Sequence, residues 1–71
     1  MELYYYFEYI KSGKCKFVFY YIPNQKVYVT GSAVLCLKGR ERSVVFDSRS
    51  DSLLDDSDKE SIVSSVMKHI E

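Results

Sequence analysis

Apolar and polar positions alternate along the first twenty-two residues, which predicts two β-strands joined by a tight turn. In residues 2–10, the set that we expect to face the core is Leu3, Tyr5, Phe7 and Tyr9. In residues 14–22, the corresponding set is Cys15, Phe17, Phe19 and Tyr21. Gly13 lies between the two segments and can supply the positive φ that a tight hairpin needs. The sequence therefore predicts a hairpin with one apolar and one mixed face.

Three shorter apolar segments continue the pattern. A turn at Pro23-Asn24 precedes a predicted strand over residues 26–30, which Thr30-Gly31-Ser32 is expected to end. Residues 33–37 fit either a buried strand or a short helix between Ser32 and Gly39. We favour the strand, because so few apolar residues do not make a stable helix. After a loop, residues 43–47 are predicted to form the last strand.

The C-terminal segment has helical periodicity. Ser57 and Glu60 match the capping-box pattern at the start of a helix over residues 58–70. Its apolar residues fall on one stripe: Ile62, Val63, Val66, Met67 and Ile70. The preceding residues 48–57 are rich in serine and aspartate, and we expect an exposed connector there.

These elements predict a single small α+β domain over residues 1–71. The fold is an antiparallel meander of four to five strands packed on one C-terminal amphipathic helix. A chain of this length buries only about 60–65% of its unfolded surface. A helix of about 14 residues is only ~21 Å long and cannot cover a wide sheet. We therefore expect a homodimer or a bound partner to cover the remainder.

The uncovered face is the first candidate site. Nine of the eleven aromatic residues lie within the first twenty-one positions, so rings occupy both faces of the hairpin. Tyrosine is common in protein interfaces and also stacks on nucleic-acid bases, with lysines contacting the phosphates. The candidate partner-binding residues, for protein or nucleic acid, are Tyr4, Tyr6, Lys14, Lys16, Tyr20, Lys26, Arg40 and Arg42.

Charge adds a second candidate surface. The net charge is zero, but residues 1–45 hold seven basic and three acidic side chains, and residues 46–71 hold three basic and seven acidic ones. The acidic alternative for binding a partner is Asp51, Asp55, Asp56 and Asp58. Zero net charge, with Glu2 and Glu8 on the predicted tyrosine face, counts against nucleic acid, since phosphate neutralisation supplies most of that affinity.

Catalytic and metal-binding chemistry is not expected. His69 is the only histidine, and it lies near the end of a helix without an adjacent nucleophile. Cys15, Cys36 and one histidine do not provide four zinc ligands. The aspartates at positions 55, 56 and 58 lack the glycine and late glutamate of a calcium loop. We predict no enzyme activity and no cofactor. We expect both cysteines to be reduced, and a disulfide between them is the alternative that the sequence leaves open.

No apolar run reaches the roughly 18 residues of a membrane span. The N-terminus has no basic cluster, so we expect a cytoplasmic protein, in the host cytoplasm if it is phage-encoded. The order of elements is similar to the PC4-like single-stranded-DNA-binding domains, which implies a nucleic-acid-binding dimer. The size and composition also look like small phage-encoded proteins, including inhibitors of host defence.

The leading hypothesis is a small non-catalytic protein-interaction module. It would act as an inhibitor or regulator of the phage or mobile-element type, and bind a host protein through the aromatic sheet face or the acidic C-terminal half. The alternative is the PC4-like single-stranded nucleic-acid-binding dimer, which would use the sheet tyrosines and lysines.

Overall fold

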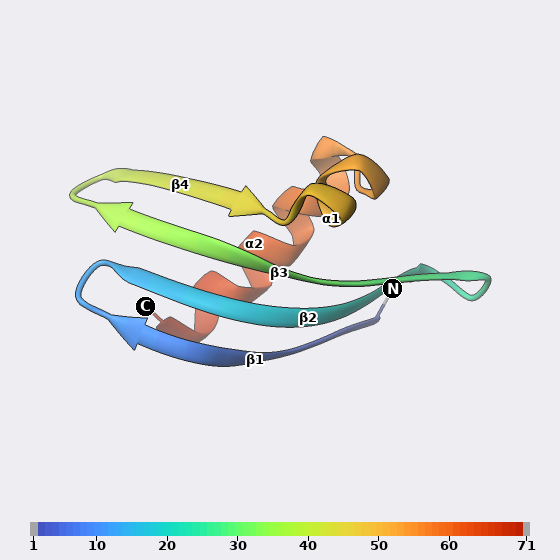
Figure 1. Ribbon diagram of the computed structural model, residues 1–71, viewed down its shortest axis with the longest axis horizontal. Coiled ribbons are helices and arrows are strands. Elements are labelled where there is room, and N and C mark those ends of the chain that lie inside the picture. The colour runs from blue at the N-terminus through green and yellow to red at the C-terminus, as the bar shows by residue number, and fades with distance from the viewer. Residues whose placement is uncertain (1, 71) are drawn as a thin grey trace.

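One antiparallel sheet, followed by two helices, makes up the computed structural model, which describes residues 2–70 (Figure 1). The strands lie side by side in the order β1-β2-β3-β4. The elements are β1 (Glu2–Lys11), β2 (Lys14–Asn24), β3 (Val27–Lys38), β4 (Glu41–Phe46), α1 (Ser48–Leu53) and α2 (Asp56–Ile70). The predicted α+β meander with a C-terminal helix is confirmed.

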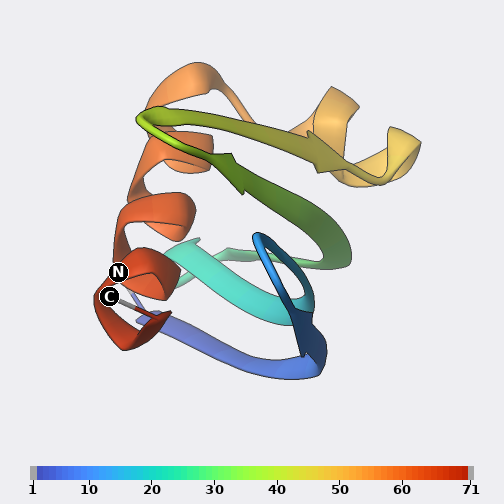
Figure 2. The ribbon, with the colours of Figure 1, turned by 90° about the vertical axis from the view of Figure 1, so that its left-hand side faces the viewer.

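The core lies between the sheet and α2, which runs across one face of the curved sheet (Figure 2). Alternate residues of β2 are buried there, as the strand pattern predicts: Cys15, Phe17, Phe19 and Tyr21. From α2 they meet Ile62, Val63 and Val66, which are also buried, with Met67 and Ile70 partly buried beside them. The predicted apolar stripe of the helix is therefore the face that packs on the sheet. We call this side of the sheet the helix face and the opposite side the outer face.

β3 replaces the two strands predicted over residues 26–30 and 33–37. The ladder with β2 runs through the expected break, where Gly31 lies opposite Phe19 and Thr30 opposite Tyr20. Residues 33–37 pair with β2 on one side and β4 on the other, so the short-helix alternative is wrong. The turn before β3 is formed by Gln25 and Lys26, because β2 continues to Asn24. A glycine within a strand leaves room for another segment to approach its backbone.

That segment is the start of α1, which corrects two predictions. Asp47 does not end the last strand, and residues 48–53 of the predicted exposed connector form a helix in which Ser50 is buried. The Asp47 carboxylate accepts hydrogen bonds from the Ser50 amide at 2.9 Å, the Ser50 hydroxyl at 2.9 Å and the Ser32 amide at 2.7 Å. A Cβ atom on Gly31 would overlap both Asp47 and Ser50, and Ser50 is fully buried. This junction fixes the end of β4 and the direction of α1.

A β-bulge changes the faces at the end of β1. The register with β2 shifts between Phe7 and Tyr9, so Tyr9 pairs with Lys16 and Ile10 with Cys15. Directly opposite residues share a face of an antiparallel sheet. Tyr9, predicted to face the core, therefore lies on the outer face, and Ile10 takes the helix face. An extra residue in one strand reverses the alternation beyond it, and the sequence pattern does not show where that occurs.

The start of α2 also differs from the capping-box prediction. Asp55 precedes the helix and accepts a hydrogen bond from the Asp58 amide at 2.8 Å. Ser57 is already inside the helix, and the Glu60 carboxylate pairs with Arg42 at 2.7 Å instead of reaching back. Aspartate caps a helix at least as well as serine, so the upstream cap extends α2 by two residues.

We expect Asp47→Ala to lower the free energy of unfolding by about 2–4 kcal/mol, because it removes the cap of α1 and leaves buried donors without an acceptor. Urea unfolding followed by circular dichroism measures this. Ser48→Ala is the matched control, since Ser48 is adjacent and exposed. Equal effects of the two substitutions would contradict the role of Asp47.

The same carboxylate predicts a dependence on pH. Burial acts to raise the pKa of Asp47. Hydrogen bonds from the backbone of Ser50, Ser32 and Arg49 and from the Ser50 hydroxyl act in the opposite direction and outweigh burial. The pKa of Asp47 therefore lies below its ordinary value of 3.8. A lowered pKa in the folded state means stability that is present above the unfolded-state pKa and is lost as pH falls through the folded one. We expect Asp47→Asn to flatten the acid limb of unfolding free energy below about pH 4. Parallel pH profiles for the two proteins would contradict this.

Candidate binding face on the outer side of the sheet

Four tyrosine rings gather on the outer face. Tyr4 of β1 lies opposite Tyr20 of β2, with ring centroids 6.4 Å apart. Tyr20 lies opposite Thr30 of β3, and the ring of Tyr28, two residues earlier in β3, stacks on Tyr20 at 5.3 Å and 12°. Tyr6 follows Tyr4 on the same face of β1. We call Tyr4, Tyr6, Tyr20 and Tyr28, with Val18 and Thr30 between them, the tyrosine face.

The tyrosine face is accessible and mostly apolar. The exposed fractions are 60% for Tyr4, 62% for Tyr6, 39% for Tyr20 and 63% for Tyr28. A hollow of about 300 Å³ lies among Tyr4, Tyr6, Val18, Tyr20 and Thr30. The Tyr4 hydroxyl donates to the Glu2 carboxylate at 3.1 Å, and this hydrogen bond raises the pKa of Tyr4. The arrangement can bind a partner by stacking and apolar contact, with hydroxyls left at the rim.

Lysines occupy the other end of the outer face. Lys14 lies opposite Cys36, Lys16 opposite Val34 and Lys11 opposite Lys14, so all three project outward. The bond from the Leu37 amide to the Gly13 carbonyl, 2.7 Å long, ties the β1–β2 turn to β3. This brings the β3–β4 turn, with Lys38 and Arg40, to the same end of the molecule (Figure 1). We call this group, Lys11, Lys14, Lys16, Lys38 and Arg40, the basic end.

Two of the predicted basic residues lie elsewhere. Arg42 is opposite Leu37 on the helix face and forms its ion pair with Glu60 of α2. Lys26 is in the β2–β3 turn, at the far end of the sheet from the other two turns (Figure 1). Of the predicted residues, the structure therefore brings together Tyr4, Tyr6 and Tyr20 in one group, and Lys14, Lys16 and Arg40 in another.

Three residues of these two groups, Tyr28, Lys11 and Lys38, were not among the predicted binding residues. The sequence predicts a strand around Tyr28 but does not indicate which face of the sheet Tyr28 occupies. Its position two residues before Thr30, which pairs with Tyr20, could have placed it on the outer face had the β2–β3 register been known. Lys11 and Lys38 lie just beyond the strands predicted over residues 2–10 and 33–37, whereas in the structure both end strands whose alternation points them outward.

Most of the predicted acidic site has structural roles instead. Asp51 pairs with Lys59 at 2.7 Å, and Asp55 caps α2. Asp58 accepts a hydrogen bond from the Tyr21 hydroxyl at 2.7 Å. Burial, followed by this bond and the nearby carboxylates, raises the pKa of Tyr21 to about 12. Asp56 is exposed, and within the described residues these four aspartates do not form one free acidic patch.

Other parts of the molecule offer little chemistry. Within residues 2–70, no group of three or more histidine, cysteine, aspartate or glutamate side chains is placed to hold a metal ion. No helix in this part of the chain is long and apolar enough to cross a membrane. His69 contacts the Tyr5 hydroxyl, which also donates to the Ser65 carbonyl at 3.2 Å, so this histidine helps to join α2 to β1.

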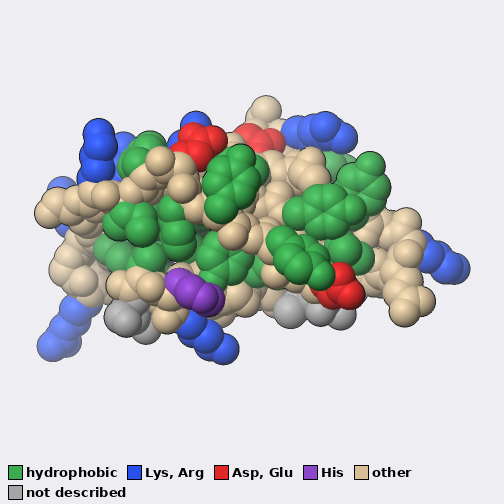
Figure 3. Space-filling model, turned by 90° about the horizontal axis from the view of Figure 1, so that it is seen from below, with side chains coloured by type: hydrophobic (Ala, Val, Ile, Leu, Met, Phe, Trp, Pro, Cys, Tyr) green, Lys and Arg blue, Asp and Glu red, His purple; other side chains and the backbone are tan. Residues whose placement is uncertain are grey.

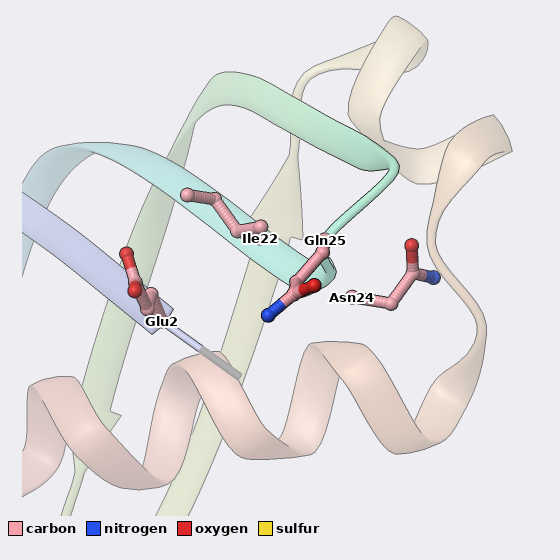
Figure 4. A pocket seen from close by; sticks show the side chains of 4 residues that line it. All are labelled: Glu2, Ile22, Asn24 and Gln25. Carbon is pink, nitrogen blue, oxygen red and sulfur yellow. The ribbon is translucent and has the colours of Figure 1, made fainter.

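A second hollow, of about 300 Å³, lies beside the β2–β3 turn (Figure 4). Its lining residues are Glu2, Ile22, Asn24 and Gln25. Asn24 points away from Glu2 and accepts a hydrogen bond from the Lys26 amide at 2.9 Å, which stabilises the turn. Glu2 is the single charged residue there, so this hollow brings no reactive pair together.

Comparison with known proteins gives no family model, no curated protein and no solved structure that matches this chain. The resemblance in element order to PC4-like domains therefore assigns no role to individual residues.

The two cysteines lie on opposite faces of the sheet. Cys15 is opposite Leu35 on the helix face and is buried, whereas Cys36 is opposite Lys14 on the outer face. Burial raises the pKa of the Cys15 thiol. We expect a short iodoacetamide pulse to label Cys36 at least about ten times faster than Cys15, since reactivity requires exposed thiolate. Peptide mass spectrometry measures both rates, and equal rates or a Cys15–Cys36 disulfide would contradict the assigned faces.

Proposed function

We propose that this chain is a non-catalytic protein-interaction module that binds its partner through the tyrosine face. The observation that carries the proposal is the set of four tyrosines, stacked in part, on a sheet face that no helix of residues 2–70 covers. Aromatic side chains in a desolvated patch account for much of the affinity of protein interfaces. The hollow among the rings gives a partner side chain a place to insert.

The charges around the tyrosine face indicate the kind of partner surface. The centre of the face is apolar, and the basic end begins on the same strands beyond Val18. A complementary protein surface has apolar or aromatic side chains at its centre and acidic side chains on one side. Charges at such a rim contribute mainly to the rate and orientation of association.

The size and composition of the chain support an inhibitor or regulator of the phage or mobile-element type. A small domain with one extended binding face acts by occupying a surface that its target needs. We place this action in the cytoplasm, where thiols such as that of the partly buried Cys36 remain reduced.

Single-stranded nucleic acid is the second candidate, favoured by the lysines that share the outer face with the tyrosines. Bases could stack on Tyr20 and Tyr28 while Lys14 and Lys16 contact phosphates. Against it, Glu8 lies 3.4 Å from Lys16, and Glu2 and Glu41 flank the same face, so three carboxylates offset part of the charge of the five residues of the basic end. Weak phosphate neutralisation makes protein the better match.

The test replaces the stacked pair, Tyr20→Ser with Tyr28→Ser, and uses Val45→Ser as the control, because Val45 is 69% exposed elsewhere on the outer face. The partner is first identified by photo-crosslinking from position 28, and its affinity is then measured by calorimetry. We expect the double variant to bind at least about 30-fold more weakly, as for two hot-spot residues, and the control to bind within about twofold.

A parallel titration uses a labelled single-stranded oligonucleotide. No change in the partner's affinity on loss of the two rings would contradict the proposal. Tight oligonucleotide binding with a steep salt dependence, lost in the double variant, would favour the second candidate instead.

A further inference from the structure

β1 is an edge strand without protection. In the strand order it pairs with β2 alone, so its other side presents backbone amides and carbonyls. The bulge lies after Phe7, which leaves a regular segment from Glu2 to Phe7. Between Leu3 and Phe7 there is no proline and no charged residue. Natural proteins usually place such residues at an edge to prevent pairing with another chain.

The other edge of the sheet is protected. β4 has six residues and begins with Glu41 and Arg42. At its end the chain leaves the sheet through Asp47, whose amide and carboxylate both bond to Ser32 of β3, and continues into α1. Short, charged edge strands that lead directly into a helix resist pairing. The β4 edge is therefore protected against pairing with another strand, whereas the β1 edge is open to it.

Both sides of the β1 edge are apolar. On the helix face, Leu3, Tyr5 and Phe7 contact the core but are only half-buried. On the outer face, Tyr4 and Tyr6 are exposed. Figure 3 views the molecule from the β1 side and shows hydrophobic side chains along most of its length, with acidic side chains and a histidine among them and lysine and arginine around the margin. The core thus stays incomplete at this edge, and an added strand would complete it.

We propose that a second copy of this chain adds to β1, with the two β1 strands antiparallel about a two-fold axis at Tyr5. Tyr5 then lies opposite its own copy, Tyr4 opposite Tyr6, and Leu3 opposite Phe7. Each pair joins residues of the same face, as a β-ladder requires. The amides of one edge meet the carbonyls of the other, because both partners offer the same unpaired groups.

This dimer has a continuous sheet of twice four strands. A two-fold axis perpendicular to the sheet places both α2 helices on one face and both tyrosine faces on the other. Glu2 then approaches Glu8 of the second copy, where the pairing ends, and Lys16 beside Glu8 offsets their repulsion. The inference goes beyond the proposed function, since it concerns the edge of the sheet and holds whatever the tyrosine face binds.

The test is the solution mass by light scattering after size exclusion, from about 10 µM to about 1 mM. Tyr6→Lys places a charge at the centre of the edge, and Val45→Lys is the control on the protected edge. We expect a dimer for the unmodified chain and for Val45→Lys, and a dissociation constant at least about tenfold higher for Tyr6→Lys. A monomer throughout, or a dimer that only Val45→Lys weakens, would overturn the proposal.

Amide hydrogen exchange on the unmodified chain tests the geometry without any substitution. In a monomer, alternate amides between Leu3 and Phe7 face solvent and exchange fast. In the proposed dimer, all of them are protected at high concentration. A dimer in which alternate amides still exchange fast would show that another surface makes the contact.

Discussion

One helix packed on a sheet of four strands can bury only one face of that sheet, and most of this structure depends on that limit. α2 has 15 residues, which make about 22 Å of helix. Its buried residues, Ile62, Val63 and Val66, all pack on the helix face of the sheet. Strand alternation sends every second side chain of β1 and β2 to the other side. Since aromatic residues fill both sets of positions, the outer face retains rings that nothing in residues 2–70 covers.

Because α2 covers only one face of the sheet, the tyrosines form two groups, one facing α2 and one on the outer face. Tyr21 and Tyr5 face α2, and each hydroxyl has a partner on it: Asp58 near its start and the Ser65 carbonyl nearer its end. These two bonds fix the helix along the sheet. On the outer face, Tyr20 instead contacts the rings of Tyr4 and Tyr28, and these contacts restrict the three side chains although no helix covers them. An ordered aromatic surface loses little conformational entropy on binding, which suits an interface.

The sequence predicted the regular parts of this fold and missed the places where one local interaction replaces another. Alternation in β2 and the apolar stripe of α2 reflect burial and were read correctly. Gly31 resembles a strand break in sequence, but its missing side chain is what lets Asp47 and Ser50 approach. The bulge after Phe7 leaves no signal in the pattern. For the site, Tyr4, Tyr6 and Tyr20 followed from alternation, whereas Tyr28 required the β2–β3 register. The β3–β4 register places Arg42 on the helix face, where it pairs with Glu60.

The most direct test of which tyrosines lie on the outer face is residue-resolved oxidative footprinting of the isolated chain. Hydroxyl radicals modify side chains according to their solvent exposure, and mass spectrometry reads each position. We expect fast modification of Tyr28 and Tyr4, strong protection of Tyr21, and an intermediate rate for the half-buried Tyr5. Protection of Tyr28 and Tyr4 with fast modification of Tyr21 would contradict the assignment of the two faces, and with it the proposed binding surface.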